Sequence, residues 1–141
     1  LPPFLIESSG VNSGFMIAQV TSAALTAENR TLANPASVET ISTSANQEDH
    51  VSMAPNAGLK LRQVMKNVKH IIWIEMLAAT QGIDFRGGLK GGLGTQLGYD
   101  KIRSLVAHLD YDRTFYKDLN RAEEFFQDEV FYNKLLEIIN N

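Results

Sequence analysis

The sequence predicts an all-α fold in which long helices of a central bundle precede shorter C-terminal helices. Between residues 57 and 81, apolar side chains recur every three or four positions, as they do along one face of a helix. Between residues 11 and 29, apolar and small residues follow one another almost without charge, which is typical of a helix surrounded by other helices. Since no segment shows a convincing strand pattern, the sequence favours helices throughout.

The first predicted helix runs from Val11 to Asn29, after a loop that contains two prolines, two serines and a glycine. Asn12 or Ser13 is expected to cap its N-terminus, because a short side-chain oxygen can accept hydrogen bonds from the first turn. Its apolar stretch, residues 15–25, is shorter than the roughly 20 residues that cross a bilayer. The sequence therefore predicts a buried central helix and no membrane partner.

Residues 30–50 form a predicted linker that is rich in serine and threonine. Near its end, Ser44 and Gln47 match the S-x-x-Q pattern of a capping box, which predicts a helix entrance. The strongest helix, 57–81, is charged on one face in its first half and apolar on all sides in its second half, apart from Glu75. Glu75 is expected to be either a buried carboxylate paired with an arginine or lysine, which is favoured, or a residue at an interface.

Residues 82–98 contain seven glycines and are predicted to form a loop. This run lacks the Gly-Lys-Ser/Thr of a phosphate loop and no strand precedes it, so a flexible connector is favoured over a nucleotide site. Helices are expected after it over residues 99–109, 118–127 and 129–140. The last two should turn these residues inward: Leu119, Ala122, Phe126, Val130, Leu135 and Ile139.

The composition limits the possible functions. With 141 residues, the chain suffices for one domain with its own core. Its net charge of −3 argues against a nucleic-acid partner and against an anionic membrane surface. It has no cysteine, which excludes disulfides and thiolate chemistry and suits the cytoplasm. No metal site is predicted, because Glu48, Asp49 and His50 are adjacent and cannot all turn to one ion, and because His70 and His108 are expected on separate helices without companions.

Three separated motifs resemble a known family: NSGFMIAQVTSAAL (Asn12–Leu25), LANPASVET (Leu32–Thr40) and TSANQEDHVSMAP (Thr43–Pro55). In this order and spacing they resemble histidine ammonia-lyase and, more widely, the aromatic amino-acid ammonia-lyases and aminomutases. The resemblance runs in register from Leu1 to about Arg86 and weakens beyond. It implies a bundle of long helices assembled as a homotetramer, with active sites built from several subunits. The implied reaction is the loss of ammonia from L-histidine to give trans-urocanate, a step of histidine catabolism.

The resemblance also assigns roles to individual residues. Glu48 corresponds to a pocket glutamate near the substrate ring, with acid–base and substrate-selecting roles. Met16 corresponds to a helix position at the ring end, and Val20, one turn further on, should line the same pocket. Phenylalanine-specific relatives typically have lysine at the Met16 position and glutamine at the Glu48 position, so the Met16 and Glu48 pair favours histidine. Ser44 and Gln47 are expected to support the pocket from behind, with helix capping as the alternative.

The chain departs from the family pattern in ways that change the prediction. The family forms its methylidene-imidazolone prosthetic group from Ala-Ser-Gly, and this tripeptide does not occur here. The chain also opens LPPFLIESSG, with no initiator methionine. We therefore expect a C-terminal fragment that depends on the remainder of the lyase chain and has no lyase activity alone. Ile41-Ser42 stands where many histidine enzymes have a proline, so the loop is expected to be less rigid.

The fragment as a whole, residues 1–141, is expected to have three parts. These are the bundle helices with the active-site loop (1–86), a Gly-rich linker (87–98) and the C-terminal helices (99–141). In isolation it should expose apolar faces over 11–25 and 71–79 and associate into oligomers. Two alternatives stay open: a lyase or aminomutase that acts on another aromatic amino acid, and a non-catalytic helical assembly module.

Overall fold

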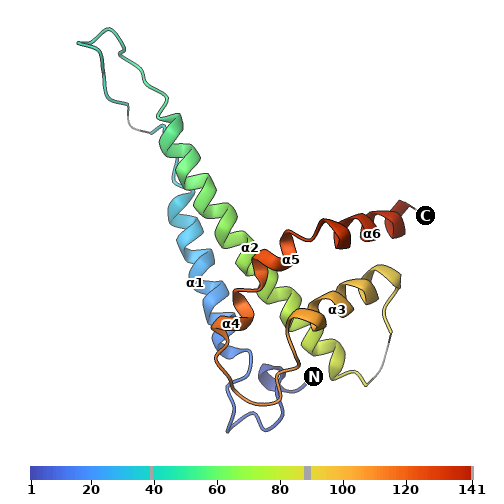
Figure 1. Ribbon diagram of the computed structural model, residues 1–141. Helices are drawn as coiled ribbons and strands as arrows, with labels where there is room; N and C mark the ends of the chain where they lie inside the picture. The colour runs from blue at the N-terminus through green and yellow to red at the C-terminus, as the bar shows by residue number, and fades with distance from the viewer. Residues whose placement is uncertain (39, 88–89, 141) are drawn as a thin grey trace.

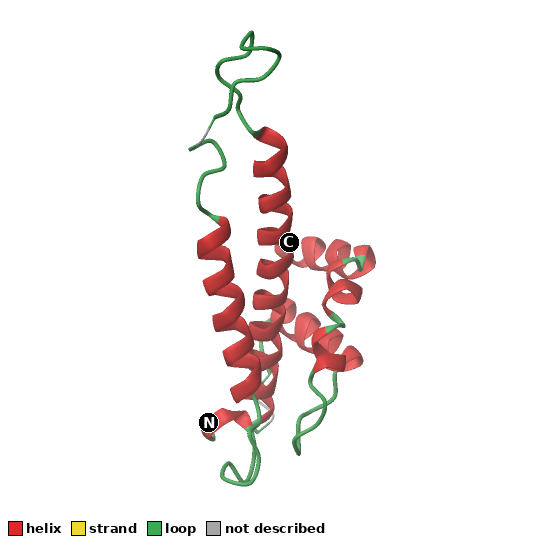
Figure 2. Ribbon diagram, turned by 90° about the vertical axis from the view of Figure 1, so that its left-hand side faces the viewer, coloured by secondary structure: helices red, strands yellow, loops and turns green. Residues whose placement is uncertain are grey.

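The structure, a computed structural model, describes residues 1–38, 40–87 and 90–140. In these ranges the helices are η1 (Pro3–Leu5), α1 (Met16–Leu32), α2 (Ala54–Asp84), α3 (Leu93–Leu105), α4 (Tyr116–Leu119), α5 (Ala122–Phe126) and α6 (Glu129–Asn140). The helices α1 and α2 form a long antiparallel pair (Figure 1). Figure 2 shows the shorter helices gathered on one side of α2. The all-α prediction is confirmed, with long helices in front and shorter ones behind.

The longest helix, α2, confirms the apolar periodicity predicted for residues 57–81 and extends it at both ends. It starts after Met53, whose φ of 52° is left-handed, and Pro55 lies in its first turn, where a missing N–H costs no hydrogen bond. It ends at Asp84, so Gly82 is helical and buried rather than part of a loop. The predicted loop 82–98 is therefore wrong at both ends, because α3 starts at Leu93. Gly88 and Leu89 of the predicted linker lie outside the described residues.

The helix α1 begins five residues later than predicted. Gly14 has a left-handed φ of 51°, which interrupts the helical path, and no side chain of Asn12 or Ser13 caps the first turn. Within this chain the helix is not buried on all sides, which agrees with the exposed apolar face expected over residues 11–25 of the isolated fragment. Ala18 is its buried residue, whereas Ile17 and Val20 are exposed.

The core lies where the second half of α2 meets the C-terminal helices. Trp73 packs against Phe125, with ring centroids 5.1 Å apart, and Phe125 packs in turn against Phe131 at the same distance. The indole Nε1 of Trp73 donates to the carbonyl of Asp118 at 2.9 Å, so this large side chain is buried without an unpaired donor. The other buried apolar side chains are Ile6, Phe15, Ala18, Ile74, Leu77, Ile102, Val106, Leu109 and Ala122.

Several inward-facing assignments need correction. Val130 and Ile139 are exposed, and Phe125 and Phe131 occupy the core instead. The predicted helix 118–127 is divided into α4 and α5, whereas α6 matches the predicted 129–140. Glu75 is exposed at the edge of a cavity between α1 and α2, and it makes no ion pair among the described residues. None of the helices within the described ranges combines the length and apolarity needed to cross a membrane.

Candidate functional site

The loop between α1 and α2, residues 33–38 and 40–53, extends beyond the end of the helical pair and is here named the arm (Figure 1). Near its middle, Thr43 and Glu48 exchange two backbone hydrogen bonds, of 2.9 Å and 3.3 Å. Between them, Ser44, Ala45 and Asn46 all have left-handed φ values, from 55° to 66°. Successive left-handed residues form a tight turn and not a helix start, so the predicted capping box is wrong.

Hydrogen bonds that involve side chains hold the arm at several positions along its length. Ser42 Oγ donates to Asn46 Oδ1 at 2.9 Å beside the turn, and the backbone N–H of Val51 donates to Thr40 Oγ1 at 2.7 Å further down. At the root, Lys60 Nζ donates to the carbonyl of Asn34. Ser42 therefore supplies a side-chain hydrogen bond that a proline in its place would lack. Glu39, in the second motif, lies outside the described residues.

Glu48 presents a free carboxylate on this turn. Its side chain is exposed and has no hydrogen-bond or ion-pair partner among the described residues. Ser44 and Gln47 are also exposed, and the Gln47 backbone N–H donates to the Ser44 carbonyl at 3.2 Å. Neither side chain is hydrogen-bonded to Glu48. Ser44 and Gln47 therefore lie in the same turn as Glu48, but they do not hold its carboxylate in position. A carboxylate held this way can accept a hydrogen bond from a ring N–H or exchange a proton with a ligand.

Met16 and Val20 lie on the outward face of α1. Their neighbours Phe15 and Ala18 turn toward the core, and Met16 and Val20 are left 37% and 55% exposed. Four residues apart, they occupy one helix face, as expected. They form an apolar wall that no other described part of this chain covers.

The structure does not bring this wall and Glu48 together within one chain. The arm follows the C-terminal end of α1, whereas Met16 and Val20 lie at its N-terminal end (Figure 1). Twelve helical residues from Val20 to Leu32 correspond to about 18 Å at 1.5 Å per residue. The predicted substrate-binding and catalytic residues are therefore at opposite ends of the helical pair.

A polar cluster at the end of α2 was not predicted. Asp84 accepts from Tyr99 Oη at 2.6 Å and from Arg103 Nη2 at 2.5 Å, and His108 Nδ1 lies 2.5 Å from the same carboxylate. Burial raises the pKa of Asp84, but the hydrogen bonds from Tyr99, His108 and Arg103 together lower it below its ordinary value. The hydrogen bond to Asp84 and burial raise the pKa of Tyr99. Asp84 is thus held as an anion by three hydrogen-bonding partners, Tyr99, Arg103 and His108.

Gln81 connects this cluster to the rest of the packed region. Its buried side-chain amide donates to the carbonyls of Leu5 and Leu109, at 3.1 and 3.0 Å, and accepts from the Leu109 backbone N–H at 3.1 Å. His108 was expected on a helix without companions, but it lies in the segment after α3 beside Asp84. A weak signal was present, since Gln81 and Asp84 share one helix face, but their partners are 15 or more residues away in sequence.

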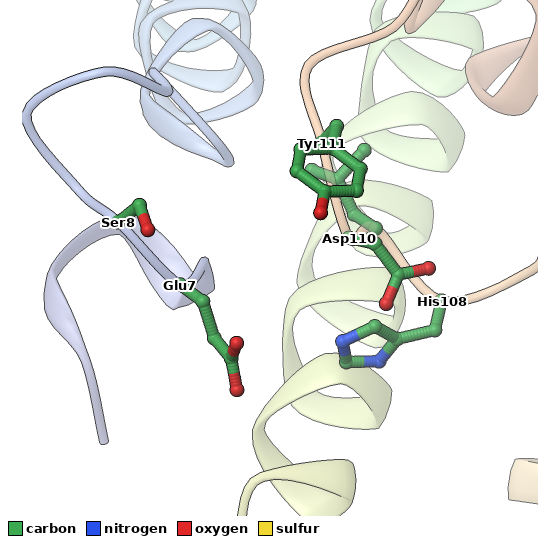
Figure 3. A pocket seen from close by; sticks show the side chains of 6 residues that line it. Glu7, Ser8, His108, Asp110 and Tyr111 are labelled. Atoms are coloured by element: carbon green, nitrogen blue, oxygen red, sulfur yellow. The ribbon is translucent and has the colours of Figure 1, made fainter.

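A cavity of about 290 Å³ lies next to His108. Figure 3 shows Glu7 and Ser8 on one side of it, and His108, Asp110 and Tyr111 on the other. None of the predicted site residues lines this cavity. Among the described residues, no group of three or more histidine, aspartate or glutamate side chains is arranged to hold a metal ion.

Comparisons with known proteins show which family has this sequence and this helical fold. The family model "Aromatic amino acid lyase" matches residues 1–104. A histidine ammonia-lyase from Enterobacter sp. (strain 638) is 52% identical over 128 residues, which is 91% of this chain and 25% of that protein. The chain thus spans about a quarter of the length of the relatives that it matches.

Solved structures give the same result for the fold. The crystal structure of histidine ammonia-lyase from Trypanosoma cruzi superposes with a TM-score of 0.91 and 38% identity, covering 98% of this chain and 27% of that one. Tyrosine aminomutase from Streptomyces globisporus gives a TM-score of 0.84 and 33% identity, covering 99% and 26%. The likeness therefore continues through the C-terminal helices, further than the motifs alone predict.

Proposed function

This chain belongs to the aromatic amino acid lyase family, and we propose that it is the C-terminal part of a histidine ammonia-lyase. One observation supports the assignment most directly: Glu48 is a free carboxylate held by a closed turn. An imidazole N–H can donate to a carboxylate, whereas a phenyl ring has no donor to offer. The identity with histidine ammonia-lyases across 91% of the chain supports the same substrate.

The reaction that we propose is the elimination of ammonia from L-histidine. The β-carbon loses a proton, the electron pair left behind forms a double bond to the α-carbon, and the bond from the α-carbon to nitrogen breaks with its electrons leaving on nitrogen, so that trans-urocanate and ammonia result. The methylidene-imidazolone electrophile of the family activates the substrate for this step. This chain contains no Ala-Ser-Gly to form it, so we assign that group to the remainder of the lyase. In this reaction the chain binds the substrate ring against Met16 and Val20. Glu48 holds or moves a proton.

We assign the two parts of this pocket to different copies of the chain. Glu48 and the Met16–Val20 wall lie at opposite ends of the helical pair, so both can face one substrate only if two subunits contribute them. The apolar side chains that the chain leaves exposed along α1 and α2, including Ile17, Leu61 and Met65, support such an assembly. We infer a homotetramer, and a cytoplasmic location that suits a chain without cysteine.

A second candidate is an enzyme that acts on another aromatic amino acid. The likeness to tyrosine aminomutase, at a TM-score of 0.84, supports this alternative. A phenol O–H can also donate to a carboxylate, so Glu48 alone does not distinguish tyrosine from histidine. The higher identity to histidine ammonia-lyase, 38% against 33% for the aminomutase, favours histidine. A non-catalytic assembly module, the remaining alternative, would oligomerise without turning over any amino acid.

The decisive test is Glu48→Gln in the complete enzyme, meaning this chain together with the remainder of the lyase. We expect histidine turnover, followed by urocanate absorbance, to fall by roughly 10²-fold or more, because the variant keeps the shape and loses the proton-accepting charge. Asp49→Asn is the matched control, since it removes a neighbouring exposed charge and should leave turnover unchanged. Unchanged turnover in Glu48→Gln would contradict the proposal, and so would urocanate formation by the isolated chain.

A further inference from the structure

We propose that Asp112 is a positioning residue that holds the substrate-facing start of α1 in place, an inference that rests on the proposed function of Met16 and Val20. Asp112 lies almost a hundred residues after these positions, in the segment between α3 and α4. It makes no contact with the wall itself. It acts on the turn that leads into the wall.

The carboxylate of Asp112 grips two successive backbone N–H groups. Its Oδ2 accepts from Ser13 at 2.7 Å, and its Oδ1 accepts from Gly14 at 2.8 Å. The contact is reciprocal, because the Asp112 backbone N–H donates to Asn12 Oδ1 at 3.3 Å. Two parallel bonds to one carboxylate fix both the position and the orientation of a peptide segment, which a single bond does not.

The same turn is held from the opposite side. A Cβ on Gly14 would lie 2.5 Å from the Phe4 carbonyl oxygen and 2.7 Å from Ile6 Cγ2, so the turn presses directly on the N-terminal segment. The Phe15 backbone N–H donates to the Phe4 carbonyl at 2.9 Å. The start of α1 therefore sits between residues 4–6 on one side and Asp112 on the other.

The segment that carries Asp112 is itself fixed. The guanidinium of Arg113 donates to the carbonyls of Ala107 and His108, both at 2.8 Å, and to Asp118 Oδ2 at 2.9 Å. Phe115 then packs edge-on against Phe15, with ring centroids 5.1 Å apart. Asp112 is thus presented by a closed segment and not by a free loop.

The hydrogen bonds from Ser13 and Gly14 to Asp112 set the position of the wall formed by Met16 and Val20. Met16 follows Gly14 by two residues, and Val20 is one turn further on, so a shift of the turn moves both side chains relative to a bound ring. The N–H groups of Ser13 and Gly14 lower the pKa of Asp112, which keeps it ionised at neutral pH. Small displacements of binding groups have large kinetic effects, since about 1 Å can cost on the order of 10²-fold.

The test is Asp112→Asn in the complete enzyme, because asparagine keeps one acceptor and loses the other. We expect the KM for histidine to rise about tenfold while kcat changes less than about threefold, as for the loss of binding contacts. A general loss of folded enzyme would instead lower kcat and leave KM unchanged. Asp112→Glu keeps both oxygens and should recover part of the loss in KM.

Asp110→Asn is the matched control. Asp110 lies in the same segment, is exposed, and makes no side-chain hydrogen bond or ion pair among the described residues. Amide hydrogen exchange over residues 8–18 should quicken in Asp112→Asn and not in Asp110→Asn. An unchanged KM in Asp112→Asn, or an equal change in both variants, overturns the inference. If the unaltered enzyme does not deaminate histidine, the proposed function fails and the substrate-facing role falls with it, while the exchange result still decides whether Asp112 holds α1.

Discussion

The molecule consists of two halves that differ in how they bury apolar surface. Residues 1–18 and 73–140, the packed half, contain all twelve buried apolar side chains found in the described residues. Residues 19–72, the open half, also have many apolar side chains on α1 and α2, but the only one of its described residues that is buried is polar Asn67. The apolar side chains of the open half therefore lack the cover that those of the packed half have.

Asn67 shows what holds the open half together. Its Nδ2 donates to Glu28 Oε2 at 2.8 Å and to Asn29 Oδ1 at 2.9 Å, and its Oδ1 accepts from Gln63 at 2.9 Å. This network fixes α1 against α2 without an apolar core. The comparison shows that the open half exposes apolar side chains that the packed half would bury, as the proposed assembly of several subunits requires.

The strongest test of the comparison is a pair of leucines on one helix. Leu77 is 1% exposed in the packed half, and Leu61 is 59% exposed in the open half. In the isolated chain, Leu77→Ala should lower the free energy of unfolding by about 2–5 kcal/mol, because it leaves a cavity. Leu61→Ala should change it by no more than about 0.5 kcal/mol at concentrations where the chain is monomeric, because Leu61 is then exposed. Urea unfolding measures both, and equal losses would contradict the division into halves.

A smaller effect is expected from the polar connections within the packed half. Gln81→Leu leaves the Leu5 and Leu109 carbonyls and the Leu109 N–H without their partner. We expect a loss of about 1–3 kcal/mol in the free energy of unfolding, the usual cost of buried polar groups left unpaired. Gln19→Leu, at an exposed position of α1, is the control, and urea unfolding should show little change. A loss in the control as large as that in Gln81→Leu would mean that burial does not decide the outcome.

The helices were predictable because their signals are local. Apolar spacing located α2 and α6, and the run from Phe15 to Leu25 located α1. Boundaries were harder, because they depend on contacts that sequence does not show. Gly82 stays helical since it packs inside, and α1 starts late because Gly14 is pressed against residues 4–6.

The candidate site was predictable only in part. The motifs predict Glu48 and Met16 as site residues, but no local pattern shows that the two lie at opposite ends of the helical pair. Ser44 and Gln47 were misread as a helix cap because three left-handed residues in a row leave no local signal. Glu75 was expected to be paired because its neighbours are apolar. It is exposed, and under the proposed assembly other subunits would cover this apolar stretch. Asp84 contacts His108 across 24 residues of sequence, and Asp112 accepts from Ser13 across 99 residues. No local sequence pattern predicts contacts over such separations.

The smallest expected effect is the dependence of the free energy of unfolding on acidic pH. Three carboxylates of the packed half, Asp84, Asp112 and Asp128, have pKa values below the ordinary 3.8. A lowered pKa in the folded state means that the group stabilises the fold above the ordinary value, and that this stabilisation is lost as the pH falls through the lowered value.

The free energy of unfolding of the isolated chain should therefore fall between about pH 5 and pH 2. Asp84→Asn should lose less over this range than the unaltered chain, because one of the linked groups is gone. Asp49→Asn, in the arm, removes a carboxyl that has no partner among the described residues and should leave the pH dependence as it was. If Asp49→Asn flattened the curve as much as Asp84→Asn, the acid-sensitive contacts would not be confined to the packed half. Urea unfolding at a series of pH values decides between these outcomes, and it does so without any partner chain or substrate.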